Sequence, residues 1–281
     1  MEFTYDGMVR YGFGFANPNH AAALICAILP FLWILIFSKG WKRWTGAGLS
    51  IIMLACLALT YSRAGIVVLI IEAGLFLLFY GRRYWKFFAM LLALFVVLVI
   101  AAKGMGRLSF DSAMSNRIDI WLGGISLFAK NPFGVGLGNS GEIVSAYMLP
   151  DGVACRTLVN SHLTLVCELG FVVGILWAII LVYLFFNNIP RKDTSAFRFA
   201  SFASFAGLLM SAWMSTVFDW EVLFYPSKFP NMTLLNVLME WLTFLLFLLI
   251  TSYLFCRNFS KRTSYGSQAE GIMISNRNFK R

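Results

Sequence analysis

The chain alternates between long apolar segments and short polar connections over most of its length. The apolar segments cover residues 20–38, 46–61, 64–80, 85–102, 160–186, 199–218 and 232–255. Segments of this length predict membrane-spanning helices, because about 20 apolar residues cross the hydrocarbon core and lipid offers the backbone no hydrogen-bond partner. A transmembrane barrel would alternate polar and apolar residues, which the run FFAMLLALFVVLVIAA does not. The pattern therefore predicts an all-α, polytopic membrane helix bundle of about seven transmembrane helices.

The polar connections differ in charge, and this difference predicts the orientation of the chain. Basic residues gather in the connections 39–45, 81–86 and 188–198 and in the tail 256–281. Acidic and basic residues mix in the N-terminal segment and in the connection 219–230. Because basic loops stay on the cytoplasmic side, we expect the N-terminus outside, the C-terminus in the cytoplasm and the long loop 103–159 outside.

The domain organisation follows from the same pattern. We expect a single transmembrane domain over residues 1–255, which includes the loop 103–159, and a disordered basic tail over residues 256–281. No cleavable signal peptide is expected, because the segment before the first span is acidic rather than basic. No water-soluble domain is predicted, so any reaction is expected at a face of the membrane.

Composition narrows the classes of function. Of the 281 residues 59% are hydrophobic and only 13% are charged, which is typical of an integral membrane protein. The net charge of +10 comes from basic residues in the connections between spans, so it indicates membrane lipid rather than nucleic acid as a partner. The five cysteines have unrelated spacings. They indicate neither a metal site nor a disulfide framework, and no metal or cofactor is expected.

Arg63 lies between two apolar segments that have almost no connection between them, in CLALTYSRAGIVVLII. A charge costs about 2.5–3.5 kcal/mol at the centre of a bilayer on insertion scales, so its presence needs a reason. One interpretation is a side chain that extends to the lipid headgroups. The other is a guanidinium that binds phosphate at the level of those headgroups.

Arg117 opens the segment RIDIWLGGISLFAK in the long loop. One stripe of this segment is apolar: Ile118, Trp121, Leu122, Ile125 and Phe128 or Ala129. The stripe predicts an amphipathic helix on the bilayer or on the bundle, with Arg117 in its first turn, where the helix dipole disfavours a cation by about 0.3–1 kcal/mol. A cation there indicates an anionic ligand. Solvation, or an ion pair with Asp111 or Asp119, is the alternative.

The glycine-rich segment NPFGVGLGNSGE follows this helix. It lacks a Gly-Lys-Ser/Thr sequence, which argues against a nucleotide-binding loop. We expect a flexible turn, whose glycines adopt backbone conformations that other residues disfavour.

Polar residues also begin the apolar segment TLVNSHLTLVCELGFVVGILW, residues 157–177. Asn160 and His162 belong to its polar start, at the outer face. His162 is the candidate general base for a substrate hydroxyl, and the alternative is a histidine that caps or hydrogen-bonds a neighbouring helix. Glu168 lies nearly two turns further along and is expected to make a structural contact, with a proton relay as the other option.

The first apolar segment begins in a similar way, with NPNHAAAL. Asn-Pro-Asn predicts a helix start, with Asn19 as its cap. The loop charges place His20 on the same side of the membrane as His162. His20 is therefore a candidate supporting residue.

Four of these segments together resemble the superfamily of O-antigen ligases and O-antigen polymerases of bacterial polysaccharide assembly. They are GFANPNHAAALICAILPF, SRAG, RIDIWLGGISLFAKNPFGVGLGNSG and NSHLTLVCELGFVVG. The resemblance implies a GT-C-like, metal-independent glycosyltransferase at the outer leaflet of the bacterial inner membrane. Such an enzyme joins a glycan carried on undecaprenyl diphosphate to a growing glycan or to lipid A core. Relatives commonly have ten or more spans, so this chain is expected to lack N-terminal ones.

The resemblance also implies roles for individual residues. The arginines of the family that hold the diphosphate correspond to Arg63 and Arg117, and its catalytic histidine corresponds to His162. Asn160, His20 and Glu168 are then supporting residues. Alignment on Glu168 and Gly170 puts the ligase histidine at Val159, three residues before His162. Polymerase-like members often lack that histidine, so the displacement favours a polymerase over a ligase.

Two other classes of function stay open. A transporter or flippase would use the same arginines and histidine to line a path for an anionic substrate. It predicts inverted repeats or broken helices at mid-membrane, and the sequence indicates neither. A non-catalytic membrane protein would instead satisfy its polar residues within the bundle.

Overall fold

The computed structural model describes residues 2–5, 8–80, 111–149, 155–191, 194–218 and 232–278. Its elements are β1 (Glu2–Tyr5), β2 (Met8–Tyr11), α1 (Pro18–Ile36), α2 (Trp41–Thr60), the helix Arg63–Tyr80, α4 (Asp111–Lys130), α5 (Ser140–Tyr147), α6 (Ser161–Asn188), α7 (Ala196–Met214) and α9 (Leu234–Asn278). Six of these helices are long and apolar enough to span a membrane. The prediction of a polytopic membrane helix bundle is confirmed. The predicted span 85–102 lies outside the described residues.

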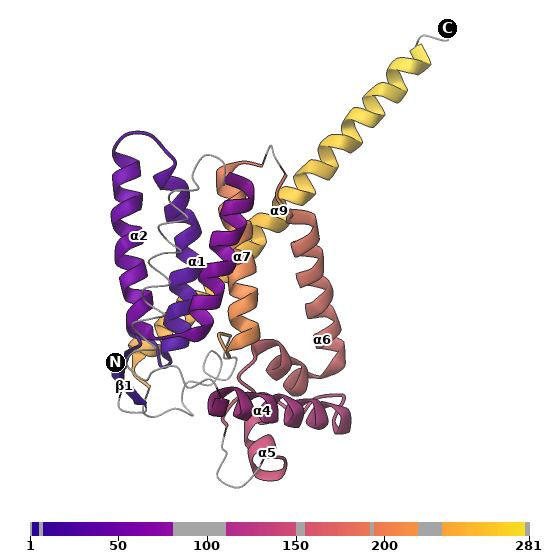
Figure 1. The fold of residues 1–281 in the computed structure, drawn as a ribbon. Coiled ribbons are helices and arrows are strands. Elements are labelled where there is room, and N and C mark those ends of the chain that lie inside the picture. The colour runs from indigo at the N-terminus through magenta and orange to yellow at the C-terminus, as the bar shows by residue number, and fades with distance from the viewer. Residues whose placement is uncertain are drawn as a thin grey trace.

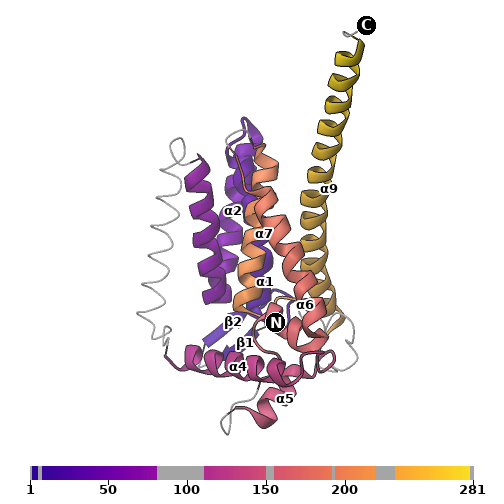
Figure 2. The ribbon, with the colours of Figure 1, turned by 90° about the vertical axis from the view of Figure 1, so that its right-hand side faces the viewer.

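Figures 1 and 2 show the long helices side by side, with α4 lying across one end of the bundle. We call this the α4 end. The antiparallel hairpin β1–β2, which the sequence did not predict, lies at the same end. The C-terminal part of α9 projects beyond the opposite end (Figure 1). The N-terminal segment and α4 thus share one end, which is the arrangement that the loop charges predict.

Two apolar clusters pack the helices together. In the first, Trp33 of α1 and Phe199 of α7 meet Phe76 edge-on, with ring centroids 5.0 and 4.6 Å apart. The second joins α1, α6, α7 and α9, where the rings of Phe218 and Phe247 lie 4.7 Å apart. Aromatic pairs of this kind add about 0.5–1.5 kcal/mol beyond the area they bury.

The TYSRAG segment makes a tight corner between α2 and the helix Arg63–Tyr80. Tyr61 adopts a left-handed conformation with φ 48°, and the Ser62 hydroxyl accepts a hydrogen bond of 3.1 Å from the Gly65 amide. Ser62 is therefore the N-cap of the new helix. A side chain at Gly65 would overlap Ala22 and Leu57, so this glycine allows close helix packing.

Helix α6 is broken at Gly170, whose φ of 83° and ψ of 176° are not helical. Figure 1 shows the two parts of α6 running in different directions. The sequence pattern indicated no broken helix at mid-membrane, and it did not reveal this break at Gly170. The reason is tertiary: a side chain at Gly170 would overlap the backbone of Phe133, which approaches the helix at this point.

The loop after α4 satisfies the backbone groups that the break exposes. The Val135 amide donates a hydrogen bond of 3.0 Å to the Cys167 carbonyl, and the Gly136 amide donates one of 3.0 Å to the Glu168 carbonyl. The Phe171 amide donates to the Pro132 carbonyl at 2.8 Å. The glycine-rich segment expected to be a flexible turn is thus hydrogen-bonded to α6. The amides of this segment donate hydrogen bonds to the carbonyls that the break in α6 leaves without helical partners.

Two helices differ in length from the expectation. α4 begins at Asp111, so Arg117 lies in its second turn rather than its first, and the dipole argument for an anionic ligand does not hold. Along α4 the side chains of Ile118, Leu122 and Ile125 are exposed, so the predicted apolar stripe faces away from the bundle. Helix α9 continues to Asn278 where a disordered tail was expected; this stretch contains no proline to end it.

Candidate functional site

The structure brings the two candidate arginines near each other at the α4 end. Arg117 of α4 donates a hydrogen bond of 2.7 Å from Nη1 to the carbonyl of Met214, where α7 ends. Burial, and to a smaller extent the positive charge of Arg63, lower the pKa of the Arg117 guanidinium. Within the described residues, Arg117 and Asp119 form no ion pair, and the Asp111 side chain lies outside them. Two like charges therefore lie close enough to repel each other.

A third guanidinium, which the sequence pattern did not point to, belongs to Arg10 of β2. Its Nε donates to the carbonyl of Thr60 at 2.9 Å, and its Nη2 donates to Oδ1 of Asn19 at 3.1 Å. Arg10 thereby ties the hairpin to the end of α2 and to the start of α1. The cap of α1 is Asn17, whose side chain accepts from the Asn19 amide, so the expectation of Asn19 as the cap is wrong.

A hollow of about 270 Å³ lies where α1 and α9 begin, beside the segment before α6 and the turn after α7. All four of these segments contribute residues to the lining, which consists of Ala16, Asn17, Asn19, His20, Arg156, Thr157, Val159, Ser215, Thr216, Met232 and Glu240. The charged or titratable members of this lining are His20, Arg156 and Glu240. We call it the α1–α9 hollow.

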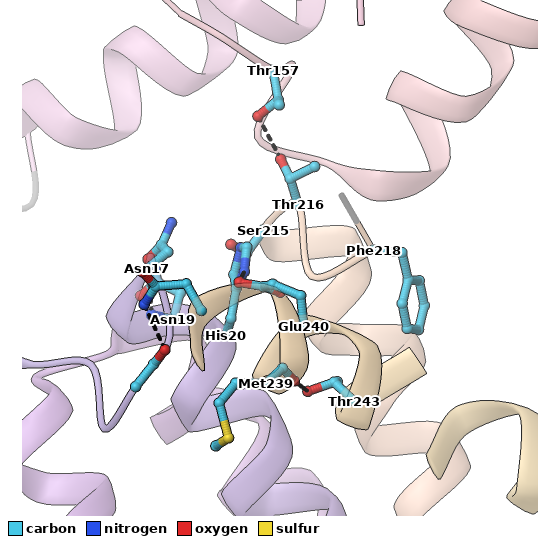
Figure 3. Close-up of polar contacts among 12 residues, drawn as sticks. Asn17, Asn19, His20, Thr157, Ser215, Thr216, Phe218, Met239, Glu240 and Thr243 are labelled. Atoms are coloured by element: carbon cyan, nitrogen blue, oxygen red, sulfur yellow. Dashed lines mark hydrogen bonds and ion pairs between the residues drawn. The ribbon is translucent and has the colours of Figure 1, made fainter. Parts of the chain in front are cut away.

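His20 and Glu240 form a buried pair in this lining. Nδ1 of His20 and Oε1 of Glu240 lie 2.7 Å apart, and Figure 3 shows the two side chains meeting between α1 and α9. The second carboxyl oxygen, Oε2 of Glu240, is buried and has no hydrogen-bond partner in the described part of the chain. Sequence reasoning missed Glu240, although an acidic residue within an apolar span is itself a signal that could have found it.

The opposite wall of the hollow is held by hydrogen bonds between the segment before α6 and the turn after α7. The hydroxyls of Thr157 and Thr216 lie 2.7 Å apart, as Figure 3 shows. The Ser161 hydroxyl donates to the Ser215 carbonyl at 3.2 Å and accepts from the Phe218 amide at 3.0 Å.

A hydrogen bond connects Arg117 to a segment that lines this hollow. Its hydrogen-bond acceptor is Met214, the residue immediately before Ser215, which belongs to the lining. The guanidinium groups and the His20–Glu240 pair therefore lie at the same end of the bundle, linked through the turn after α7.

His162 lies outside the lining of the hollow. Its Nδ1 accepts a hydrogen bond of 3.0 Å from the Trp177 indole, and its Nε2 lies 3.4 Å from the Leu209 carbonyl. An imidazole that accepts at Nδ1 carries its proton on Nε2, which suits donation to that carbonyl. With both nitrogens engaged, His162 can accept a substrate proton only after the Trp177 contact opens.

Asn160 and Glu168 make local contacts. The side chain of Asn160 accepts hydrogen bonds of 3.0 Å from the amides of His162 and Leu163, so it caps α6. The buried carboxylate of Glu168 accepts a hydrogen bond of 2.7 Å from the Ser140 hydroxyl at the start of α5. Neither residue belongs to the lining of the hollow.

Residues 48–178 match the protein family described as O-antigen ligase. An O-antigen polymerase of Salmonella muenchen is 26% identical over 155 residues, an alignment that covers 50% of this chain and 38% of the relative. The chain thus matches well under two thirds of that relative's length. No solved structure matches the chain. The family match contains Arg63, Arg117 and His162 but neither His20 nor Glu240.

Proposed function

We propose that the chain is a membrane glycosyltransferase of cell-surface polysaccharide assembly, because its similarity is to O-antigen ligases and polymerases. Its donor is a glycan on undecaprenyl diphosphate, and its acceptor is a growing glycan or lipid A core. It works without a metal at the outer leaflet of the bacterial inner membrane, with the N-terminus outside and the C-terminus in the cytoplasm. The displaced histidine favours the polymerase reaction.

The observation that carries this proposal is the family match over residues 48–178, which contains Arg63 and Arg117, together with the repulsion between these two charges. Two guanidinium groups that repel each other at the end of a membrane bundle are stabilised when a doubly charged anion binds between them. A diphosphate on a lipid presents such an anion at the headgroup level. Burial of Arg117 strengthens the attraction, because a medium of low dielectric screens charge less than water does.

The reaction follows from this placement. A hydroxyl of the acceptor attacks the anomeric carbon of the donor sugar, and the new glycosidic bond forms as the bond to the diphosphate oxygen breaks. The leaving undecaprenyl diphosphate takes the bonding electrons, and Arg63 and Arg117 stabilise the developing charge. The hydroxyl proton passes to a base. The resemblance assigns that role to His162, which requires its contact with Trp177 to open.

One observation favours a transporter as a second candidate, namely the break in α6. Transporters place broken helices at substrate sites, where the exposed backbone groups bind ions or substrate. Here the Cys167 and Glu168 carbonyls already bond to the loop after α4. A transporter also moves its substrate without forming a glycosidic bond. Analysis of the product therefore separates the two functions.

The test uses Arg63→Gln and Arg117→Gln, with Lys130→Gln as the control. Lys130 is an exposed cation in the last turn of α4, so its loss changes the net charge equally. The purified full chain in nanodiscs receives the lipid-linked oligosaccharides extracted from the bacterium that encodes it, with and without EDTA. Loss of either site charge is expected to weaken undecaprenyl diphosphate binding at least about tenfold, since charge-assisted hydrogen bonds contribute about 1.5–3 kcal/mol.

Three results would contradict the proposal. They are no glycosidic product from the wild-type chain, product that disappears with EDTA, or equal diphosphate binding by the arginine variants and the Lys130 control. Arg117→Lys keeps the positive charge but cannot make the bidentate hydrogen bonds of a guanidinium to phosphate. It is expected to give intermediate binding.

A further inference from the structure

Glu240 lines the α1–α9 hollow, and one of its carboxyl oxygens is buried without a hydrogen-bond partner among the described residues. Oε2 of Glu240 has no hydrogen bond within the described residues, whereas Oε1 of the same group is held by His20. Leaving a buried acceptor without a hydrogen bond is unfavourable, and more so if the group is charged. An unsatisfied carboxyl oxygen in a residue that lines a cavity indicates a ligand that brings a hydrogen-bond donor.

The contact with His20 fixes how the carboxylate can act. When Nδ1 of His20 carries a proton, it donates to Oε1 and holds the carboxylate in one orientation. The second oxygen is then the acceptor that remains for a ligand hydroxyl. A base oriented by a neighbouring hydrogen bond is a common arrangement for general base catalysis.

The size and position of the hollow suit a sugar ring. Its volume of about 270 Å³ lies just below the roughly 300–1,000 Å³ of pockets for drug-sized ligands, so it fits about one ring rather than an oligosaccharide. Hydrogen-bonding side chains line it, including Asn17, Thr157 and Thr216. Ser215 joins it to Met214, the residue whose carbonyl binds Arg117.

From these observations we propose that the α1–α9 hollow binds the acceptor sugar and that Glu240, in place of His162, is the general base of the transfer, because both ring nitrogens of His162 are already engaged. This inference rests on the proposed glycosyltransferase function. Oε2 of Glu240 takes the proton of the acceptor hydroxyl as that oxygen bonds to the anomeric carbon, and the undecaprenyl diphosphate leaves with the electron pair. His20 is a positioning residue, and the proton on Glu240 passes to water after product release.

The decisive variant is Glu240→Gln, which keeps the size of the side chain but cannot take a proton. We expect the rate of product formation to fall about 10²–10⁴-fold, the usual contribution of a general base. Binding of undecaprenyl diphosphate, which the arginines hold, is expected to remain at the wild-type level. Glu142→Gln is the matched control, because Glu142 is an exposed carboxylate of α5 at the same end of the molecule.

A second variant separates catalysis from structure. Glu240→Ala opens space in the hollow, and added formate can occupy it and accept the proton. We expect formate to restore part of the lost rate in Glu240→Ala but none in Glu240→Gln, whose amide fills the space. A purely structural role of the buried pair predicts no rescue in either variant.

His20→Asn tests the positioning role. We expect a smaller loss of rate than in Glu240→Gln, a higher KM for the acceptor and unchanged diphosphate binding. Equal loss of diphosphate binding and of product in all three variants would mean that the pair only holds the fold, and would overturn the inference.

The two levels of the proposal fail in different ways. If the wild-type chain forms no glycosidic product, the glycosyltransferase function itself fails. If the wild-type chain and Glu240→Gln form product at the same rate, the function stands and only the role of Glu240 fails.

Discussion

The indole N–H of Trp177 donates a hydrogen bond of 3.0 Å to Nδ1 of His162, across the break that Gly170 makes in α6. Nε2 of the same ring lies 3.4 Å from the Leu209 carbonyl of α7. The imidazole therefore joins the two parts of α6 to each other and to α7. A helix that is interrupted in a membrane needs such contacts, because lipid cannot satisfy its polar groups.

The variant Trp177→Phe tests what this contact does. It keeps an aromatic ring against Phe247 and removes only the N–H donor. If the imidazole is structural, the free energy of unfolding should fall by about 0.5–1.5 kcal/mol, the typical net contribution of one hydrogen bond. Product formation should change little. Thermal unfolding in detergent and the glycan product are the two measurements. A tenfold faster reaction would instead show that Trp177 keeps a basic His162 out of the reaction.

Gly170→Ala is expected to disrupt the junction between α6 and the loop after α4. A residue with a side chain at φ 83° and ψ 176° is strained by about 1–3 kcal/mol, and here the new methyl group would also overlap the Phe133 backbone. Gly48→Ala is the control, since a methyl group there meets no other atom. We expect a clear loss of thermal stability and of product for Gly170→Ala alone. Equal melting temperatures for the two variants would contradict this expectation.

The spans were predictable because the requirement that creates them is local. The predicted segment 20–38 and the helix Pro18–Ile36 differ by only two residues at each end. The polar start of the segment 157–177 likewise predicted a helix start, which Asn160 caps. The break at Gly170 was not predictable, because it depends on the approach of the Phe133 backbone, which no local pattern records.

The residues of the candidate site were likewise predictable only in part. Arg63 and Arg117 stood out because charges near the membrane are costly, and the structure brings them together. The His20–Glu240 pair joins residues 220 positions apart, so only the packing of α1 against α9 reveals it. The interpretation of His162 as a base depended on its position at the outer face, and the sequence could not show that Trp177 occupies one of its nitrogens.

The orientation of the chain can be tested with thiol reagents. Glu142→Cys places a thiol on the exposed face of α5 at the α4 end, whereas Cys256 is exposed in α9 toward the opposite end. If the N-terminus is outside, a membrane-impermeant maleimide should label the new cysteine in intact spheroplasts and label Cys256 only after lysis. Wild-type chain without the new cysteine gives the background. The reverse order of labelling would invert the topology and place the proposed site in the cytoplasm.

Cys155 should react slowly and with a defined dependence on pH. Burial raises the pKa of its thiol, and the hydrogen bond from the Ser145 hydroxyl lowers it by a smaller amount. Because the thiolate is the reactive form, the alkylation rate should be low at neutral pH and rise as the pH approaches the raised pKa. Ser145→Ala removes the stabilising hydrogen bond, so it should slow alkylation further. Faster alkylation in that variant would mean that Ser145 mainly limits access to the sulfur.

Glu72 provides the last prediction, because it is a fully buried carboxyl group of the helix Arg63–Tyr80 with no hydrogen bond to either oxygen among the described residues. Burying a polar group without a partner is unfavourable, so Glu72→Leu should raise the free energy of unfolding by about 1–3 kcal/mol. Gly207→Ala should lower it, since the new methyl group would overlap the Glu72 carboxyl.

The double variant Glu72→Leu with Gly207→Ala shows whether the two effects share one cause. If the Glu72 carboxyl is the group that a methyl at Gly207 would overlap, Gly207→Ala should lower the free energy of unfolding by a different amount once Glu72 is leucine. The changes caused by the two single substitutions would then not add up to the change in the double variant. Thermal unfolding of the four proteins in one detergent gives both numbers. A lower melting temperature for Glu72→Leu alone would show instead that the carboxyl stabilises the fold. If that variant also lost product formation, Glu72 would be a functional residue of the span.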